Sequence, residues 1–561
     1  MASPRAPGWA RGASRWLADR RLVLATGVAA ALPIVVATVR AVVDGWAPLG
    51  DDGLIAVRAY ETFTAHPPLL GMPSTGPTGV LDEQTFHLGP LLFWLLALPA
   101  HFLGPSSLAV TAGLVNIASV MGIVGLAHRR GGRPLMFATA VALAVMLASL
   151  PAENYSDVWN PAVAVLPFTL LLFLAWSLAC GEYRLLPLTV LVGSFVVQCH
   201  LIFLVPALGA VAVGLAGLIV LRPRPRRQEV RGWAVAAVVV AVVCWSGPLI
   251  DQAANRPGNL VQLARAAQSD EPTLGPGIGA RAVVRATGVP PWWLRPPRGA
   301  LQRIADLDTS PGPLAVASSV LVLAGLTAVA AAGWRRRRRD VLAAGTLGLA
   351  ICAAIALATA SVPSASYAST GYALWWTSAA GMWIWLALGW SVAVLAAPAR
   401  VALVRRPALL LAAGLGASAA AGIAVSAAAD PPEEPFQQLR TITDRLEAEL
   451  PDGLAVRVEG TWNSNTVFLA GGFQLGIVYA LLREGRTVTA PSLTDLGSRY
   501  GTDDEDGPVA RVRVDVDPQP VDRGRLIARL RVPSADPKNP FSTAPASRMV
   551  AVTLLPSTAL R

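Results

Sequence analysis

The sequence predicts an α-helical polytopic membrane protein with about 11 transmembrane helices and a small C-terminal extracytoplasmic α/β domain. Of its 561 residues, 54% are hydrophobic and only 14% are charged, whereas a soluble protein carries about 25% charged residues. The apolar residues form long blocks, and short basic runs separate many of these blocks. After residue 430 the composition becomes that of a soluble protein. These three features define the fold class before any motif is considered.

Each predicted span is an apolar block of about 20 residues, the length that crosses the hydrocarbon core of a bilayer. The blocks are 22–43, 107–127, 135–151, 161–180, 185–202, 204–221, 233–250, 313–333, 341–362, 371–396 and 407–428. The first block follows a basic N-terminus, as the apolar part of a signal peptide does, but it is long enough to span and no clear cleavage site follows it. We therefore expect it to be retained as a span.

The orientation in the membrane follows from the basic residues of the short loops. These residues occur at 128–133, 222–227, 335–339 and 400–406, and all four loops fall on the side of the basic N-terminus if the spans alternate. Because basic loops stay in the cytoplasm, we expect a multi-pass protein of the cell membrane, which is the cytoplasmic membrane. Its N-terminus would lie in the cytoplasm and its C-terminus on the outer side. The net charge of +11 therefore reflects membrane topology, and binding to nucleic acid is not expected.

This topology leaves three long regions outside, which are the loops 44–106 and 251–312 and the C-terminal region 430–561. We divide the chain into a transmembrane domain, residues 1–429, and an extracytoplasmic α/β domain, residues 430–561. The first loop is not a plain linker, because it contains the apolar segment 87–103. That segment is short and broken by prolines, so an interfacial or re-entrant helix is expected rather than a span.

The C-terminal domain is predicted from its alternating helical and extended patterns. A helix begins after the proline-rich segment 430–435, since apolar residues recur at helical spacing from Phe436 to Leu450. The remaining predicted elements are a strand at 454–458, a helix at 467–482 and strands at 487–490, 509–516, 526–532 and 549–555. This order indicates a small α/β unit.

An acidic pair, Asp51 and Asp52, opens the first outer loop soon after the first span. A carboxylate at that depth faces the outside at the membrane surface, where it could deprotonate a hydroxyl that attacks a lipid-borne sugar. One of the two could instead cap the helix that we expect from Asp52 to Ala65, because aspartate is favoured at N-caps. Spacing alone supports both interpretations equally.

Further polar candidates lie in the outer loops and at the outer end of the fifth span. They are Glu83, His87, Glu153, Asp157, Trp159, Asn160 and His200. Aromatic faces stack on sugar rings, carboxylates bind hydroxyls, and histidine can hydrogen-bond a phosphate. Each also has a plainer interpretation. Glu83 could belong to a solvated turn, and His87 could cap an interfacial helix. The residues before Pro161 could form an aromatic belt at the membrane interface, and His200 could be paired inside the bundle.

Two other features were weighed as ligand sites. The segment 290–298 mixes two tryptophans with two arginines, so it could hold a lipid phosphate, although an interfacial anchor has the same composition. The four cysteines lie in or beside apolar blocks and match neither a zinc motif nor a disulfide framework. No metal site is predicted from the sequence.

Taken together, these features resemble the GT-C superfamily of membrane glycosyltransferases, in particular bacterial relatives of protein mannosyltransferases and aminoarabinose transferases. The resemblance rests on the acidic pair Asp51-Asp52, the segment His87-Leu88-Gly89-Pro90-Leu91-Leu92-Phe93-Trp94, the loop ending Trp159-Asn160-Pro161 and the extracytoplasmic domain at the end of the chain. It covers residues 20–225 best and is a similarity of layout.

The resemblance implies inverting transfer of a hexosyl or pentosyl group from a polyprenyl-phosphate donor to an envelope glycan, lipid or protein. Asp52, with Asp51 next, would be the general base, and Asp157 or Glu153 would be the second carboxylate. The donor phosphate would meet Arg58, His87 or His200. Some members of the superfamily need a divalent cation and others do not. Adjacent carboxylates can bind such a cation.

The main rival interpretation is a transporter or flippase for a lipid-linked envelope precursor. It would require charged residues deep in several spans, or paired broken helices in the two halves. The predicted spans are largely uncharged and the polar clusters sit at their outer ends, which favours chemistry at the surface. A non-catalytic scaffold acting through residues 430–561 is a third interpretation.

Overall fold

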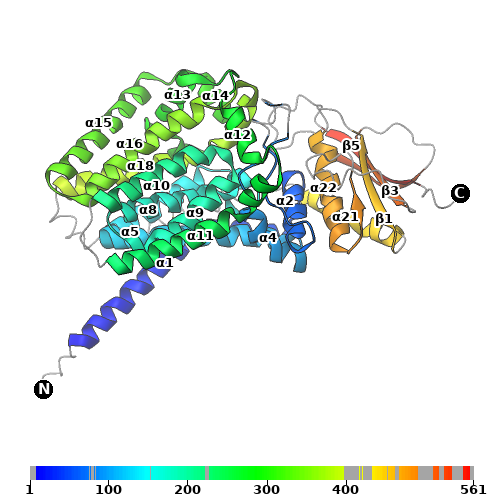
Figure 1. Cartoon of the computed structure of the whole chain (residues 1–561), viewed down its shortest axis with the longest axis horizontal. Helices are drawn as coiled ribbons and strands as arrows, with labels where there is room; N and C mark the ends of the chain where they lie inside the picture. The colour runs from blue at the N-terminus through cyan, green and yellow to red at the C-terminus, as the bar shows by residue number, and fades with distance from the viewer. Residues whose placement is uncertain are drawn as a thin grey trace.

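The computed structural model describes residues 8–74, 76, 81, 84–151, 153–220, 227–297, 299–396, 416, 420, 433–450, 453–461, 467–490, 509–516, 524–533 and 547–555. It consists of a bundle of long apolar helices with a small α/β unit at one end (Figure 1). Within the described residues, 8 helices are long and apolar enough to cross a membrane. The predicted fold class, a helical polytopic membrane protein with a small C-terminal sheet, is confirmed.

The bundle is built from long apolar helices and a few short helical turns at their ends. They are α1 (Gly8–Val43), α5 (Ser106–Ala148), α7 (Asn160–Val163), α8 (Val165–Ala179), η2 (Tyr183–Leu185), α9 (Leu186–Cys199), η3 (Leu201–Phe203), α10 (Leu204–Val220), α11 (Arg227–Ala254), α15 (Pro313–Arg335), α16 (Arg339–Ala360), α17 (Thr370–Ala373) and α18 (Trp376–Ala396). Every side chain of α8 is buried, as expected of a helix that is apolar on all sides. This helix forms the centre of the bundle, in contact with α5, α9, α10 and α18.

Helix α5 contains the second and third predicted spans, because the chain reverses within it. Gly131 and Gly132 have non-helical backbone angles, and Gly132 has φ of 65°, a conformation that glycine adopts at little cost. Asn116 and Leu147 both hydrogen-bond to Tyr155, whereas a straight helix would hold them about 46 Å apart. The two halves are therefore antiparallel, as predicted from the basic segment 128–133.

Ten of the predicted spans thus have a helical counterpart, and 407–428 lies outside the described residues apart from two single positions. The fifth predicted span, 185–202, is wrong at its end. Helix α9 stops at Cys199 because His200 is extended, with φ of −154° and ψ of 134°. The His200 side chain then accepts a hydrogen bond from the Ile202 amide, which starts the turn η3.

Short elements gather at the end of the bundle that faces the C-terminal unit. They are α2 (Asp51–Tyr60), η1 (Glu61–Phe63), α4 (Leu91–Phe102), α6 (Glu153–Ser156), α12 (Asn259–Ala267), α13 (Gly275–Thr287), η4 (Trp292–Leu294), α14 (Ala300–Asp308) and η5 (Ser364–Ser369). With 12 residues, α4 is shorter than a span, as predicted for segment 87–103.

Ion pairs of basic residues join the turns at the other end of the long helices. Arg129 and Arg130, beside the α5 reversal, form ion pairs with Glu182 before η2. Arg338 pairs with Asp340 where α15 turns into α16, and Trp176 at the end of α8 donates to the Asp340 carbonyl oxygen at 2.9 Å. The two described basic loops, 128–133 and 335–339, thus share one end of the bundle, and the polar loops of the first half lie at the other.

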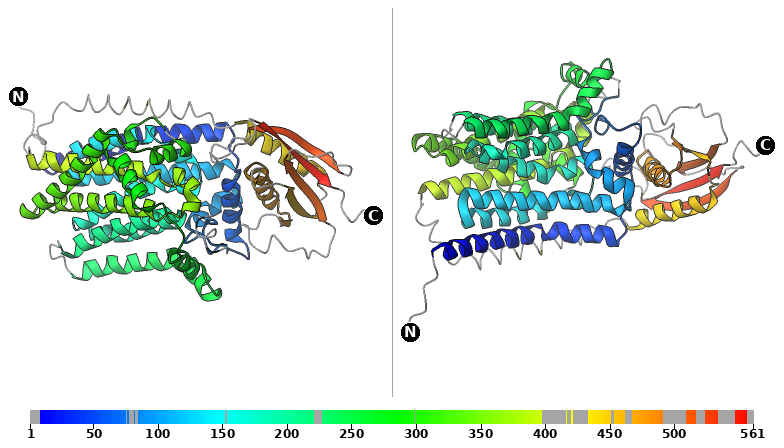
Figure 2. Two further views of the ribbon diagram at one scale, coloured as in Figure 1. Left: turned by 90° about the horizontal axis from the view of Figure 1, so that it is seen from above. Right: turned by 60° about the horizontal axis from the view of Figure 1, so that its bottom comes forward.

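The C-terminal unit is a five-stranded mixed sheet with two helices. Its elements are α21 (Glu433–Glu449), β1 (Ala455–Thr461), α22 (Val467–Arg483), β2 (Val488–Thr489), β3 (Val509–Val516), β4 (Arg525–Pro533) and β5 (Ser547–Leu555), and the strand order is β2-β1-β3-β5-β4. The β1 strand is parallel to β2 and β3, whereas β5 is antiparallel to β3 and β4. Helix α22 lies between the sheet and the bundle, whereas α21 packs on α22 and β4 (Figure 2). Each predicted element of this unit is present.

Candidate active site

The acidic pair lies at the start of α2, on the side of the bundle that faces the C-terminal unit. Gly50 precedes the helix with φ of 57° and is its N-cap, without a side-chain cap hydrogen bond. The interpretation of Asp51 or Asp52 as the N-cap is therefore wrong. Both residues belong to the first helical turn, where the partial positive charge of the helix end favours a carboxylate. The Asp51 side chain is exposed, whereas Asp52 is buried with 4% exposure.

Trp159 joins the acidic pair to the loop before α7. Its indole Nε1 donates a hydrogen bond of 2.9 Å to Asp51 Oδ2. The Trp159 amide in turn donates to Asp157 Oδ1 at 3.0 Å, an aspartate turn of the kind that fixes the residue two positions further on. Residues that are far apart in the sequence thus meet at one place, and the buried indole orients the Asp51 carboxylate.

Two aromatic residues that the sequence analysis did not select enclose Trp159. The ring centroid of Tyr372, on α17, is 4.7 Å from that of Trp159. The Trp375 centroid, just before α18, lies at 5.7 Å and nearly perpendicular to it. In the sequence both lie in the first residues of the predicted span 371–396, where aromatic residues are common for interfacial reasons. The available signal, several aromatics within residues 372–376, was therefore not specific.

Asn160 extends the site toward the two histidines. Its Nδ2 donates to the carbonyl oxygen of Cys199 at 2.8 Å, and so satisfies one of the carbonyls left open at the end of α9. The next residue, His200, stacks on His87 with ring centroids 4.4 Å apart. His87 Nδ1 accepts a hydrogen bond of 3.3 Å from the Leu201 amide. The predicted residues from both outer loops therefore form one continuous set of contacts from Asp51 to His87.

The position of His87 is fixed by a short antiparallel ladder in the first loop. The His87 amide donates to the Met72 carbonyl oxygen at 2.8 Å, and the Gly71 amide donates to the His87 carbonyl oxygen at 3.1 Å. The neighbouring Phe86 amide donates to Asn259 Oδ1 at 2.9 Å. Backbone bonds from two outer loops thus hold this histidine, whereas the alternative of an interfacial cap would have left it at a helix end.

Burial lowers the pKa of His87 well below its ordinary value of 6.5, and the nearby His200 lowers it further. The unfolded chain therefore binds this proton more readily than the folded protein, so acidification below about pH 6.5 favours unfolding. We expect the thermal unfolding midpoint in detergent to fall between pH 8 and pH 5.5. The fall should be smaller in His87→Asn, which can still accept the Leu201 hydrogen bond. His66→Asn, a change at an exposed histidine, serves as the control, and equal falls in wild type and His87→Asn would contradict the expectation.

Three predicted residues are not joined to this set. Arg58 forms an ion pair with the buried Glu61, with Nη1 2.7 Å from Oε2, and lies about 10 Å along the helix axis from Asp51. Glu83 lies outside the described residues, and for Glu153 only the backbone of α6 is described. Within the described chain no three His, Cys, Asp or Glu side chains are grouped as ligands for a metal ion.

Two side chains of the segment 290–298 share the carboxylate of Asp306. Trp292 is buried and donates to Asp306 Oδ2 at 2.8 Å. Arg295 forms an ion pair with the same carboxylate at 3.3 Å. The Arg303 guanidinium, 1% exposed, lies 4.8 Å from the centre of the Trp292 ring. It also donates to three oxygens around the start of α18, on Leu374, Thr377 and Ser378.

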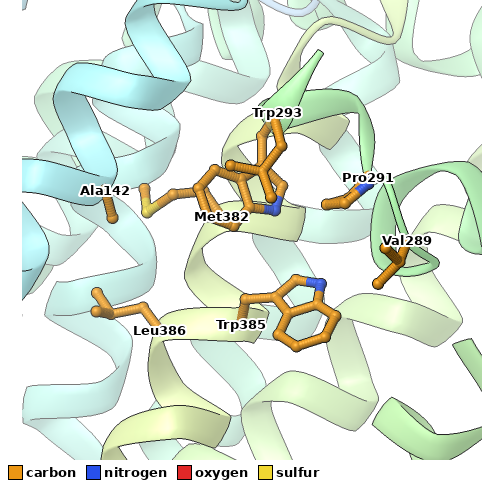
Figure 3. A pocket seen from close by; sticks show the side chains of 8 residues that line it. Ala142, Val289, Pro291, Trp293, Met382, Trp385 and Leu386 are labelled. Atoms are coloured by element: carbon orange, nitrogen blue, oxygen red, sulfur yellow. The ribbon is translucent and has the colours of Figure 1, made fainter. Parts of the chain in front are cut away.

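An apolar cavity of about 420 Å³ lies beside α18. It is lined by Ala142, Val289, Pro291, Trp293, Leu294, Met382, Trp385 and Leu386, and the labelled side chains of Figure 3 surround it from three separate segments. Three residues of the segment 290–298 line it, whereas none of the described residues proposed for catalysis or sugar binding does. The cavity can accept an apolar group, but it contains no group suited to proton transfer.

The fold and the site together define a polytopic membrane protein. Where its helices meet the C-terminal α/β unit, a tryptophan donates a hydrogen bond to an exposed carboxylate. No protein-family model matches the sequence, and comparison with curated proteins finds no significant relative. Among solved structures, the chain is similar to ArnT from Cupriavidus metallidurans in the apo state, with 14% identity, a TM-score of 0.45 and coverage of 96% of this chain and 98% of that chain. It is likewise similar to ArnT bound to undecaprenyl phosphate, with 13% identity, a TM-score of 0.43 and the same coverage.

Proposed function

We propose that this protein is a membrane glycosyltransferase that moves a sugar from a polyprenyl-phosphate donor to an acceptor outside the cytoplasmic membrane, with inversion at the anomeric carbon. The observation that supports this most directly is the hydrogen bond from Trp159 Nε1 to Asp51 Oδ2. It holds an exposed carboxylate beside aromatic faces, at the end of the bundle opposite the basic loops. That combination suits a sugar and a proton acceptor at a membrane surface.

In the proposed reaction, a carboxylate of the acidic pair removes the proton of an acceptor hydroxyl. The oxygen attacks the anomeric carbon, the bond from that carbon to the phosphate oxygen breaks, and the polyprenyl phosphate leaves with the electron pair. The resemblance implies Asp52 as the base, with Asp51 next. The exposure of Asp51 and the burial of Asp52 favour the reverse order, because a base must reach the proton that it takes.

We propose that His87 and His200 bind the donor phosphate. Each accepts a backbone hydrogen bond at Nδ1, so the neutral imidazoles carry their protons at Nε2. Two N–H donors at Nε2, on rings 4.4 Å apart, suit the oxygens of one phosphate group.

The distribution of buried charge favours this proposal over a transporter. The buried charged residues of the described chain are Asp52, Glu61, Asp251, Arg285, Arg303, Asp306 and Asp515. All except Asp251, near the end of α11, lie outside the long apolar helices. A transport path through the bundle would need such groups inside the spans.

The proposal is tested by incubating the purified protein with a panel of polyprenyl-phosphate sugars and measuring released polyprenyl phosphate. We expect release from at least one donor, faster when envelope extract supplies the acceptor. Movement of a lipid-linked precursor across proteoliposomes, without cleavage of any donor, would instead establish the transporter interpretation.

The role of Trp159 gives a narrower prediction. Trp159→Phe keeps an aromatic ring against Tyr372 but removes the N–H that orients Asp51. Since a hydrogen bond to a charged group contributes about 1.5–3 kcal/mol, kcat should fall by about 10-fold or more. The matched control is Trp375→Phe, because the Trp375 Nε1 has no hydrogen-bond partner to lose, and it should retain most activity. Equal activities of the two variants would remove Trp159 from the mechanism.

A further inference from the structure

The C-terminal α/β unit packs directly on the helix that carries the acidic pair. Helix α22 lies against α2 in both Figure 1 and Figure 2. The contact is close enough to exclude a side chain at Gly53, where an added Cβ would be 2.8 Å from Leu475 Cβ and 3.2 Å from the Gly476 nitrogen. An added Cβ on Gly476 would in turn lie 2.9 Å from the Pro48 carbonyl oxygen. The two segments therefore approach at backbone distance.

Hydrogen bonds fix the same contact at two places. The amide of Gly50, the N-cap of α2, donates to the Gly472 carbonyl oxygen at 3.3 Å. The hydroxyl of Tyr479, which is 1% exposed, donates to the Ala100 carbonyl oxygen near the end of α4 at 2.9 Å. The first half of α22 thus contacts the start of α2. A later turn of α22 contacts α4, the bundle helix that packs on α2.

Helix α2 needs such neighbours, because it is only 10 residues long and isolated helices of that length are marginal in water. Its position is determined by α4 on the bundle side and by α22 on the other. Asp51 is the first residue of α2, directly after the Gly50 contact. A displacement of α22 therefore shifts the carboxylate relative to Trp159, which belongs to the bundle.

We infer that the C-terminal unit is a positioning element for the reaction: α22, through Gly472, Gly476 and Tyr479, sets the place of the acidic pair. This inference rests on the proposed function for its kinetic consequence. Small misplacements of a reacting group lower the rate by up to about 100-fold, so the contacts of α22 control kcat while KM stays nearly constant.

The test is a mutant cycle in the full chain across the closest contact. Gly53→Ala forces α22 away and should lower kcat by about 10-fold or more. Leu475→Gly removes the nearest atom and should keep kcat near wild type, although it lowers the thermal unfolding midpoint because glycine weakens a helix. The double variant should recover kcat to within about 3-fold of wild type. Compared with Gly53→Ala, the double variant then has a higher kcat but a lower thermal unfolding midpoint. A merely structural role does not produce this combination.

Gly345→Ala is the matched control, since its Cβ would be equally crowded, 2.8 Å from the Ala330 nitrogen, in a contact between α15 and α16. It should lower stability without a selective fall in kcat. Tyr479→Phe is the milder second variant, for the case that Gly53→Ala does not fold. It deletes only the hydrogen bond to Ala100 and should lower kcat several-fold.

Amide hydrogen exchange of residues 51–60 supplies a readout that does not depend on activity. Exchange should rise in Gly53→Ala and return toward wild type in the double variant. Unchanged exchange and kcat in Gly53→Ala, or a fall in kcat that Leu475→Gly does not reverse, would overturn the positioning role. A wild-type protein that cleaves no donor would instead defeat the proposed function, and the exchange measurements would still decide whether α22 positions α2.

Discussion

Asp51→Asn should lower kcat for sugar transfer by about 1000-fold, the largest effect that we expect from a single substitution. Asparagine preserves the shape of the side chain and can still accept the Trp159 hydrogen bond, but it cannot take the proton of the acceptor hydroxyl. Because the fold is kept, expression and the thermal unfolding midpoint should remain at wild-type values. The measurement is the steady-state rate of polyprenyl-phosphate release in purified, detergent-solubilised protein.

Asp52→Asn is the comparison that assigns the base. Asp52 is 4% exposed, whereas Asp51 is exposed, so the change at Asp52 should have the smaller effect on rate and the larger effect on stability. The opposite ranking would restore Asp52 as the base, as the sequence analysis expected. Full activity in both variants would exclude a carboxylate base in the acidic pair.

Arg303→Met should lower the free energy of unfolding by about 3 kcal/mol. The guanidinium is 1% exposed and donates to the Leu374 carbonyl oxygen at 3.1 Å and to Ser378 Oγ at 2.6 Å. Methionine fills much of the same volume but leaves these buried oxygens without their donor, and it removes the charge from the Trp292 face. The measurement is denaturant unfolding in detergent, followed by far-UV circular dichroism.

Arg265→Met serves as the control for this prediction, because Arg265 is exposed on α12 and surface changes usually stay within about 0.5 kcal/mol. If Arg303→Met were as stable as this control, the Arg303 contacts would not hold the second outer loop to the bundle.

Much of the fold was predictable because the signals are local. Apolar blocks of span length gave the long helices, and the glycines at 131–132 with the adjacent basic residues gave the reversal inside α5. Two prolines and a short apolar length identified α4 as too short for a span. Alternating patterns identified every described strand of the C-terminal unit. Each of these features depends on backbone preference and hydrophobicity within one segment.

The candidate site was predictable in its residue types but not in its contacts. Asp51, Asp157, Trp159, Asn160, His87 and His200 were selected because polar and aromatic residues at the ends of apolar blocks are unusual. The sequence could not reveal that Trp159 orients Asp51, or that Tyr372 packs against Trp159. Arg58 was assigned to a phosphate because its partner Glu61, three residues later and 2% exposed, was not considered.

By itself the sequence determined that this is a helical membrane protein, where its long apolar helices and the elements of its C-terminal unit lie, and which polar residues lie at the ends of its spans. Only the tertiary structure decided which of them meet, such as Asp51 with Trp159 and His87 with His200, and that α22 packs on α2. The physical reason is that helix formation depends on neighbours along the chain. Side-chain partners from distant segments depend on how whole helices pack, and a contact such as that of Gly53 with Leu475 exists only once both helices are in place.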